Sequence, residues 1–190
     1  MMSPRTNNVL AAAVLVFGLI AGAGAAQAEG GATLLGMRFP ARVASFAFQD
    51  TTDYESRSAG GGYSAKYLNG REWADVYVYT LGRSNIPQTY ESGVSKTQYE
   101  QAASVIPKAA QMGAYRSAKP LKAFSLPARG TPRFDCGRFA IVSKEGQAND
   151  SVLCVTNRNG KFIKVRLSGP KGSLTNAEVS GFITPWLRDF

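Results

Sequence analysis

The two cysteines of this 190-residue chain, Cys136 and Cys154, have a spacing that limits their chemistry. A thiol–disulfide active site favours Cys-X-X-Cys at the start of a helix, whereas these cysteines lie 18 residues apart on predicted strands. If those strands pair in the register that places residue 136 opposite residue 154, the two cysteines face each other within reach of a disulfide. We therefore predict a structural disulfide, with free buried thiols and a redox or metal site as the alternatives.

Histidine is absent from the sequence. Its absence removes the Ser-His-Asp and Cys-His nucleophile pairs, histidine zinc sites, and the side chain best suited to proton transfer near neutral pH. Carboxylate or lysine catalysis remains open. We predict a non-enzymatic protein with no catalytic residues, no metal and no cofactor.

Two tyrosines, Tyr77 and Tyr79, share one face of a predicted strand, opposite Val76 and Val78. That aromatic surface needs to be covered by a helix or by a ligand, and we favour a helix. The alternative function uses the same surface: a carbohydrate-binding or hydrolytic enzyme in which a nearby carboxylate such as Asp75 acts beside the tyrosine rings.

The chain is basic, with 22 Lys and Arg against 13 Asp and Glu. This excess favours an anionic partner, although solubility alone is an equally good explanation. We predict that a basic strand rim formed by Lys164 and Arg166, with Lys161 beside them, contacts an anionic envelope component or another protein. A purely structural envelope protein is a third interpretation. Nucleic acid is disfavoured because the chain is predicted to be exported, and no oligomeric state is predicted.

The first 28 residues have the three-part order of a secretory signal peptide: a polar start with Arg5, an apolar run from Val9, and small residues ending at Ala28. A membrane anchor is the less favoured alternative. Cleavage after Ala28 would leave no transmembrane helix and a net charge of +8, because only Arg5 is lost from the +9 of the full chain. We predict a protein of the periplasm or one that is secreted.

The segment from Gly60 to Tyr79 contains two strand-like runs joined by Asn69-Gly70, a strong hairpin signal. A two-residue turn at that position pairs Tyr63 with Val76. The preceding Gly60–Gly62 run lacks the Gly-Lys-Ser/Thr of a phosphate-binding loop, so we interpret it as a flexible turn.

Three further strands are predicted at about 134–143, 151–157 and 161–168. Asn159-Gly160 joins the last two and pairs Cys154 with Val165. One face of this ribbon is then apolar, and the opposite face, where Val155 meets Lys164, is basic at its rim. A strand containing Pro120 precedes them and is expected at the edge of the sheet.

Two helices follow the strand groups. The first is predicted to begin at Thr97, with Glu100 completing a capping box, and to be kinked or divided at Pro107. The second begins at Thr175 with Glu178 in the same role. Because amphipathic helices need an apolar sheet face to cover, we expect one α+β domain over 29–190, an αβα sandwich-like arrangement with a mostly antiparallel sheet.

The order of these elements, with "GGGYSAKY", "ADVYVYTLG", a capped helix and "KFIKVRL" before a closing helix, resembles the PsbP-like superfamily of αβα sandwiches. It is also similar to small secreted proteins of Gram-negative bacteria. The resemblance covers most of residues 37–190 and implies a non-catalytic domain that docks on or assists another protein. It supplies no catalytic residues to transfer, and neither cysteine is part of it.

Overall fold

A computed structural model describes residues 31–127 and 133–187, and the predicted signal peptide at 1–28 lies outside that part of the chain. The strands there begin with the hairpin of β1 (Ala32–Leu34) and β2 (Met37–Phe39). The remaining elements form or cover one sheet: β3 (Arg42–Val43), β4 (Phe46–Asp53), β5 (Tyr63–Asn69), β6 (Glu72–Tyr79), α1 (Ser92–Gln111), β7 (Ser117–Leu126), β8 (Phe134–Val142), β9 (Ala148–Arg158), β10 (Lys161–Pro170), α2 (Asn176–Ile183) and the 3₁₀ helix η1 (Thr184–Leu187).

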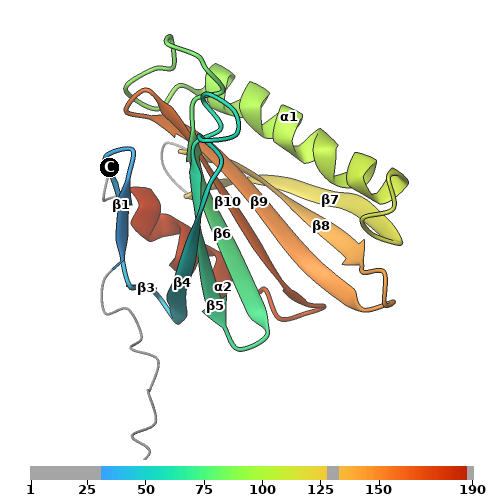
Figure 1. Cartoon of the computed structure of the whole chain (residues 1–190). Coiled ribbons are helices and arrows are strands. Elements are labelled where there is room, and N and C mark those ends of the chain that lie inside the picture. The colour runs from blue at the N-terminus through green and yellow to red at the C-terminus, as the bar shows by residue number, and fades with distance from the viewer. Residues whose placement is uncertain (1–30, 128–132, 188–190) are drawn as a thin grey trace, which may run out of the picture.

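The main sheet has eight strands in the order β3-β4-β5-β6-β10-β9-β8-β7, and every neighbouring pair is antiparallel. The first half of the chain supplies one side of the sheet and the second half supplies the other, and they meet where β6 pairs with β10 (Figure 1). The strand with Pro120, β7, lies at the edge as predicted.

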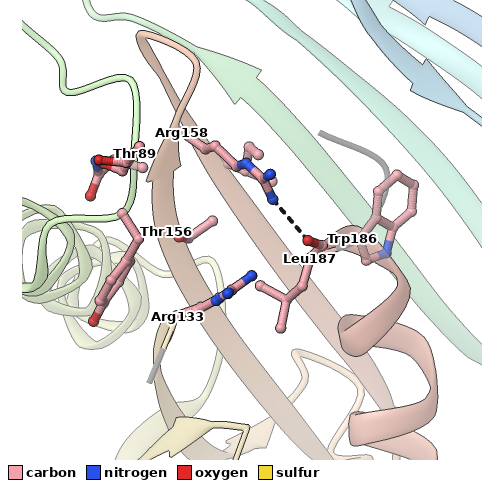
Figure 2. Close-up of a pocket in the computed structure, with 9 residues that line it drawn as sticks. Thr89, Arg133, Thr156, Arg158, Trp186 and Leu187 are labelled. Atoms are coloured by element: carbon pink, nitrogen blue, oxygen red, sulfur yellow. Dashed lines mark hydrogen bonds between the residues drawn. The ribbon is translucent and has the colours of Figure 1, made fainter. Parts of the chain in front are cut away.

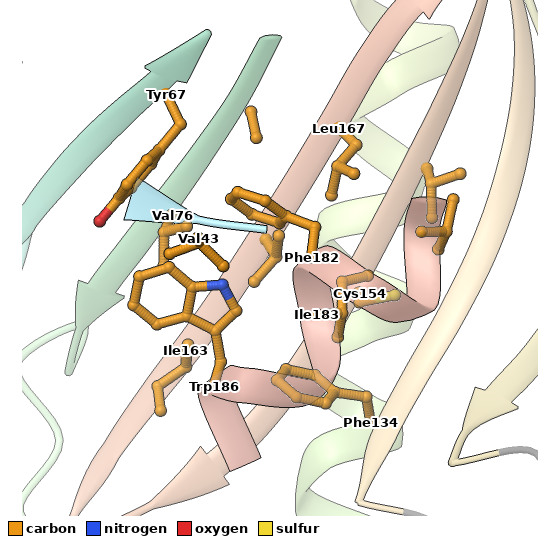
Figure 3. Close-up of a cluster of buried hydrophobic side chains, with 14 of the residues drawn as sticks. Val43, Tyr67, Val76, Phe134, Cys154, Ile163, Leu167, Phe182, Ile183 and Trp186 are labelled. Carbon is orange, nitrogen blue, oxygen red and sulfur yellow. The ribbon is translucent and has the colours of Figure 1, made fainter. Parts of the chain in front are cut away.

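The two helices lie on opposite faces of this sheet. Helix α1 packs across β7, β8 and β9, where Ile106 joins Phe139, Ile141 and Leu153 in a small cluster. Helix α2 and η1 lie on the other face, over the main hydrophobic core (Figure 3). The core residues labelled in Figure 3 come from strands on both sides of the β6–β10 pair and from the closing helix: Val43, Tyr67, Val76, Phe134, Cys154, Ile163, Leu167, Phe182, Ile183 and Trp186.

The predicted αβα sandwich is wrong. Of the residues that the structure describes, 47% are in strands and 21% in helices, a β-rich fold whose two helices do not form layers that cover the sheet. The physical reason is size: eight strands spaced by about 4.8 Å extend over about 34 Å, whereas one helix is about 10 Å wide. The expectation of αβα layers did not take this difference in width into account. An αβα sandwich was also the fold that the PsbP-like resemblance implied.

The β9–β10 hairpin has the predicted register, with Cys154 opposite Val165 and Lys164 opposite Val155. Asn159 and Gly160 both have positive φ, 50° and 68°, as a tight turn at this sequence requires.

The β5–β6 hairpin is shifted by two residues from the prediction. Tyr63 lies opposite Val78, and Gly70 with Arg71 forms the turn. Gly70 has a φ of 59° and occupies the first central position of the turn instead of the second. Because side chains alternate with a period of two, this shift left the assignment of side chains to each face unchanged.

Helix α1 begins at Ser92, five residues before the predicted cap, and it is continuous through Pro107. Thr97 lies inside the helix, where its hydroxyl donates to the carbonyl oxygen of Gly93 at 2.8 Å. The predicted capping box and a division of the helix at Pro107 are therefore both wrong, and the kink given as the alternative stays a prediction. Helix α2 does have the predicted box: Thr175 Oγ1 accepts from the Glu178 amide at 3.2 Å, and the Glu178 carboxylate accepts from the Thr175 amide at 2.8 Å.

Cys136 and Cys154 lie directly opposite each other on β8 and β9, as predicted. Their sulfur atoms are 2.05 Å apart and form a disulfide. Both residues are buried in the core beneath α2, so the bond ties β8 to β9 on the face away from α1. In the described part of the chain, no helix has both the length and the apolar character needed to cross a membrane.

Candidate functional site

The predicted tyrosines and two of the three predicted cations, Lys164 and Arg166, meet on the α1 face of the sheet because β6 pairs with β10. Lys164 lies directly opposite Tyr77, and Arg166 lies directly opposite Asp75. Alternation along β6 puts Tyr79 on the same face. Five side chains, here called the tyrosine–lysine groove, therefore come together from two strands that are far apart in the sequence: Asp75, Tyr77, Tyr79, Lys164 and Arg166.

The Lys164 ammonium lies over aromatic rings. Its Nζ is 3.9 Å from the centroid of the Tyr77 ring and 5.7 Å from that of Tyr79. Burial, with a smaller contribution from the positive charge of Arg166, lowers the pKa of Lys164 from 10.5 to about 8. Lys164 is therefore a partly desolvated cation stabilised by ring faces.

Arg166 is held by other protein groups. Its Nε donates to Ser151 Oγ and its Nη2 to the hydroxyl of Tyr115, both at 3.2 Å. Burial raises the pKa of the neighbouring Asp75 carboxyl, an effect that the charges of Lys66 and Arg166 oppose. Arg166 thus positions Tyr115 and neutralises part of the Asp75 charge.

Lys161 does not join this group. It follows the alternation of Ile163 and Val165, so it lies on the opposite face of β10 from Lys164. Its Nζ donates to the carbonyl oxygen of Asn159 at 3.0 Å in the hairpin turn. The predicted three-residue rim is therefore divided between two faces.

Helix α1 covers only part of the aromatic surface. Tyr79 is 6% exposed, and its hydroxyl accepts from Gln98 Nε2 at 3.2 Å. Ser95 fixes the helix on the sheet by donating to the carbonyl oxygen of Val155 at 3.0 Å. Tyr77 is only half-buried and lines a cavity beside the helix. The expectation that a helix covers the surface holds for Tyr79 but not for Tyr77.

The cavity beside α1 has a volume of about 530 Å³, which is within the range of small-molecule sites. Tyr77, Tyr79 and Lys164 form its sheet wall, and Gln98 is part of its helix wall. The Gln98 amide oxygen is buried and has no hydrogen-bond partner among the described residues. An unpaired buried amide oxygen costs about 1–3 kcal/mol, so a donor brought by a ligand would be favourable here.

Two exposed apolar side chains stand at the mouth of this cavity. Leu81 is 49% exposed and Val105 is 58% exposed, and both line it. A second cavity of about 290 Å³ shares Tyr77 and contains Asp75 and Arg166. The groove therefore combines a cation, ring faces and an apolar mouth, with one carboxylate in the adjoining space.

The loop after β4 closes the far side of the groove and brings Tyr54 close to Tyr77, with ring centroids 6.1 Å apart. The Glu55 carboxylate holds this loop by accepting from the amides of Gly60 and Gly62, both at 2.8 Å. Gly62 has a φ of 70°, and a Cβ there would lie 1.9 Å from the carbonyl oxygen of Val78. The glycine run is a turn, as predicted, and the amides of Gly60 and Gly62 bind the chain's own carboxylate.

Replacing Glu55 with alanine is expected to lower the free energy of unfolding by about 2 kcal/mol, since two charge-assisted bonds to loop amides are lost. Urea unfolding measures the change. Asp53→Ala is the matched control, because Asp53 accepts a single exposed bond from the Ser56 amide. Equal effects of the two substitutions would contradict a special role for Glu55.

Sequence reasoning missed Gln98, Tyr54 and Tyr115, all of which line the groove. Gln98 could have been suspected from its place one turn before Ala102 on the apolar stripe of the helix. Tyr54 and Tyr115 lie in segments between elements, where no periodic signal applies.

Comparison with known proteins gave no matching family model and no matching curated protein. The PsbP-like relationship therefore stays a prediction.

Proposed function

We propose that this chain is a non-enzymatic exported protein, periplasmic or secreted, that binds an anionic envelope component in the tyrosine–lysine groove. The observation that carries the proposal is the Lys164 ammonium over the Tyr77 ring, at 3.9 Å, inside a cavity of about 530 Å³. The one ion pair within residues 31–127 and 133–187 joins Lys96 to Glu100, so Lys164 has no carboxylate within 4.0 Å there.

The energetic argument rests on desolvation. Lys164 loses part of its hydration in the folded protein, and the ring faces compensate for only part of that loss. Because its pKa is lowered to about 8, the charged form destabilises the folded state at neutral pH, and this cost disappears as the pH rises toward 10.5. A bound anion would restore the favourable environment of the charged form.

The walls of the groove indicate what the anion carries. Tyr54 and Tyr77 offer ring faces, and Leu81 and Val105 extend the apolar surface to the mouth. A ligand with an anionic head and an apolar or ring-shaped body matches both parts. Lipids and lipid-linked sugars of the cell envelope have this chemistry.

The small number of carboxylates that line the two cavities favours a binding role over a catalytic one. Glycoside hydrolysis needs two carboxyl groups across the scissile bond, and Asp75 is the one carboxylate among the described residues lining the two cavities. The sequence also has no histidine to replace the second group. The extracytoplasmic location is supported by the disulfide, since such bonds persist mainly outside the cytoplasm.

The paired rings of Tyr54 and Tyr77 favour a second candidate, the binding of an uncharged sugar. The rings are inclined by 31° with centroids 6.1 Å apart, and together they offer a stacking surface. In this alternative Lys164 contributes little to affinity, and a neutral saccharide binds equally well at every pH at which the protein is folded.

The test uses the fluorescent aromatic sulfonate anilinonaphthalenesulfonate, whose charge does not change near neutral pH. Its affinity for the unsubstituted protein is expected to fall about tenfold between pH 7 and pH 9, because Lys164 loses its proton near pH 8. Lys164→Ala should bind about tenfold more weakly at pH 7 and show no such fall. Lys164→Arg should stay tight at pH 9, since arginine remains charged. The chain has no histidine and both cysteines are in the disulfide, so no remaining side chain has an ordinary pKa in this window.

Lys161→Ala is the matched control, because it removes the same charge from the same strand on the opposite face. Circular dichroism checks that each variant is folded. Equal weakening by Lys161→Ala and Lys164→Ala, or an affinity that stays constant to pH 9, would contradict the proposal. Tight binding of a neutral saccharide that is unaffected by Lys164→Ala would support the second candidate instead.

A further inference from the structure

A separate cavity of about 300 Å³ lies at the end of the β9–β10 hairpin, beside η1. Figure 2 shows the side chains of Arg133 and Arg158 pointing into the same space, facing Leu187. Arg133 directly precedes β8, and Arg158 is the last residue of β9. Two guanidinium groups from separate elements therefore converge on one cavity.

Arg158 is oriented by the closing helix. Its Nη1 donates to the carbonyl oxygen of Leu187 at 2.8 Å, the bond drawn as a dashed line in Figure 2. This bond uses one of the five N–H donors of the guanidinium group. Arg133 is exposed, and its side chain has no hydrogen-bond partner within the described ranges. Most of the donors of both groups therefore remain available.

Among the described residues, no acidic side chain lines the cavity. Thr156 contributes a hydroxyl from the cavity wall, although the residue as a whole is only 4% exposed. The amide group of Asn157 is already used, since its Nδ2 donates to Thr89 and its Oδ1 accepts from Glu91. The free polar groups of the cavity are thus two cations and hydroxyls.

The opposite wall is apolar. Ile163 and Trp186, each 2% exposed, and Leu187 line it. Like-charged guanidinium groups that face one space repel each other. An anion between them would relieve that repulsion.

We propose that Arg133 and Arg158 bind a phosphate group carried on a small apolar or aromatic body. A planar carboxylate presents two oxygens, which one guanidinium fork satisfies. Two forks and a hydroxyl from Thr156 match the three terminal oxygens of a phosphate monoester better. The apolar wall formed with Ile163 and Leu187 then holds the body of the ester. This site is distinct from the tyrosine–lysine groove and does not depend on it.

The experiment is titration calorimetry of the full chain with phenyl phosphate, inorganic phosphate and benzoate at constant ionic strength. Phenyl phosphate is expected to bind more tightly than either of the other two. Arg133→Ala should weaken its binding at least tenfold, and Arg133→Lys should weaken it severalfold, because the charge remains but the fork is lost. Arg158→Ala should act similarly. Arg57→Ala removes an exposed arginine from the β4–β5 loop and should have no effect.

Arg133→Ala keeps the test decisive if Arg158→Ala folds poorly, since Arg133 is exposed and makes no side-chain bond there. Equal losses in Arg57→Ala and Arg133→Ala would show binding to net charge alone and overturn the site. Benzoate binding as tightly as phenyl phosphate would overturn the phosphate assignment. Lys164→Ala should leave phenyl phosphate affinity unchanged, and a loss in that variant would place the ligand in the groove instead.

Discussion

Replacement of Phe182 by alanine is expected to lower the free energy of unfolding by about 4 kcal/mol, within the usual range for a large buried aromatic side chain. Phe182 is fully buried, and its ring lies 4.8 Å from that of Phe46 and 5.6 Å from that of Tyr67 between centroids. Trp186 completes the group at 6.0 Å. The substitution would open a cavity where the closing helix meets both sides of the sheet (Figure 3).

Urea unfolding followed by circular dichroism measures this loss. Leu121→Ala is the control, because Leu121 is 60% exposed on β7 and its truncation should change stability by less than about 0.5 kcal/mol. Since α2 lies on the face away from the groove, the folded Phe182 variant should keep its affinity for the sulfonate probe. A loss below about 1 kcal/mol would contradict the assignment of α2 to the core.

Removal of the Cys136–Cys154 disulfide by a double substitution to alanine is expected to cost about 3 kcal/mol. The estimate follows from the loop that the bond closes, with a sequence separation of 18 residues, through the chain entropy that it removes from the unfolded state. The native ladder between β8 and β9 remains in the variant, so the fold should survive.

Unfolding of the oxidised protein, the reduced protein and the double variant gives three comparable midpoints. The reduced protein and the double variant should both be less stable than the oxidised protein. Both cysteines are at most 1% exposed, so alkylation in the presence of a reductant should be slow until the protein unfolds. Rapid alkylation of the folded exported protein without reductant would contradict a disulfide in the native state.

The alternation of apolar and polar residues was enough to predict which side chains of a strand share a face. The opposition of Cys136 and Cys154 followed from a period of two and a single assumed register, and the structure has that register. The β5–β6 hairpin shows the limit of this reasoning, because the turn lies at Gly70-Arg71 and the pairing shifts by two residues. The position of a turn depends on small differences in backbone conformation. The face of each side chain does not change when the strand pairing shifts by an even number of residues.

Helix ends were predictable only where local bonds define them. Thr175 and Glu178 satisfy each other's amides, so the start of α2 was visible in the sequence. Helix α1 begins at Ser92 after Glu91, which makes no side-chain cap. Tertiary contacts hold its first two turns instead: the Glu91 amide donates to Asn157 Oδ1, Ser95 bonds to β9 and Gln98 bonds to Tyr79. The same pattern at Thr97 and Glu100 was misleading because Thr97 bonds within the helix.

The individual residues of the tyrosine–lysine groove could be predicted from the sequence, but their arrangement in space could not. Tyr77, Asp75 and Lys164 were each singled out by type and face, but no local pattern indicates that β10 pairs with β6. The Arg133 and Arg158 pair was not visible at all, because their neighbourhood depends on where β8, β9 and η1 end in space.

The sequence by itself determined the faces of the strands, the β9–β10 turn and the start of α2, because these depend on neighbours along the chain or on a period of two. Only the tertiary structure decided the order of strands in the sheet, how much of the tyrosine face α1 covers, and the partial burial of Lys164. These features depend on the packing of segments far apart in the chain, where burial and pairing energies compete over the whole molecule. The chemistry of the groove arises at that level, since a lysine that is ordinary in the sequence titrates near pH 8 only when the sheet and α1 enclose it.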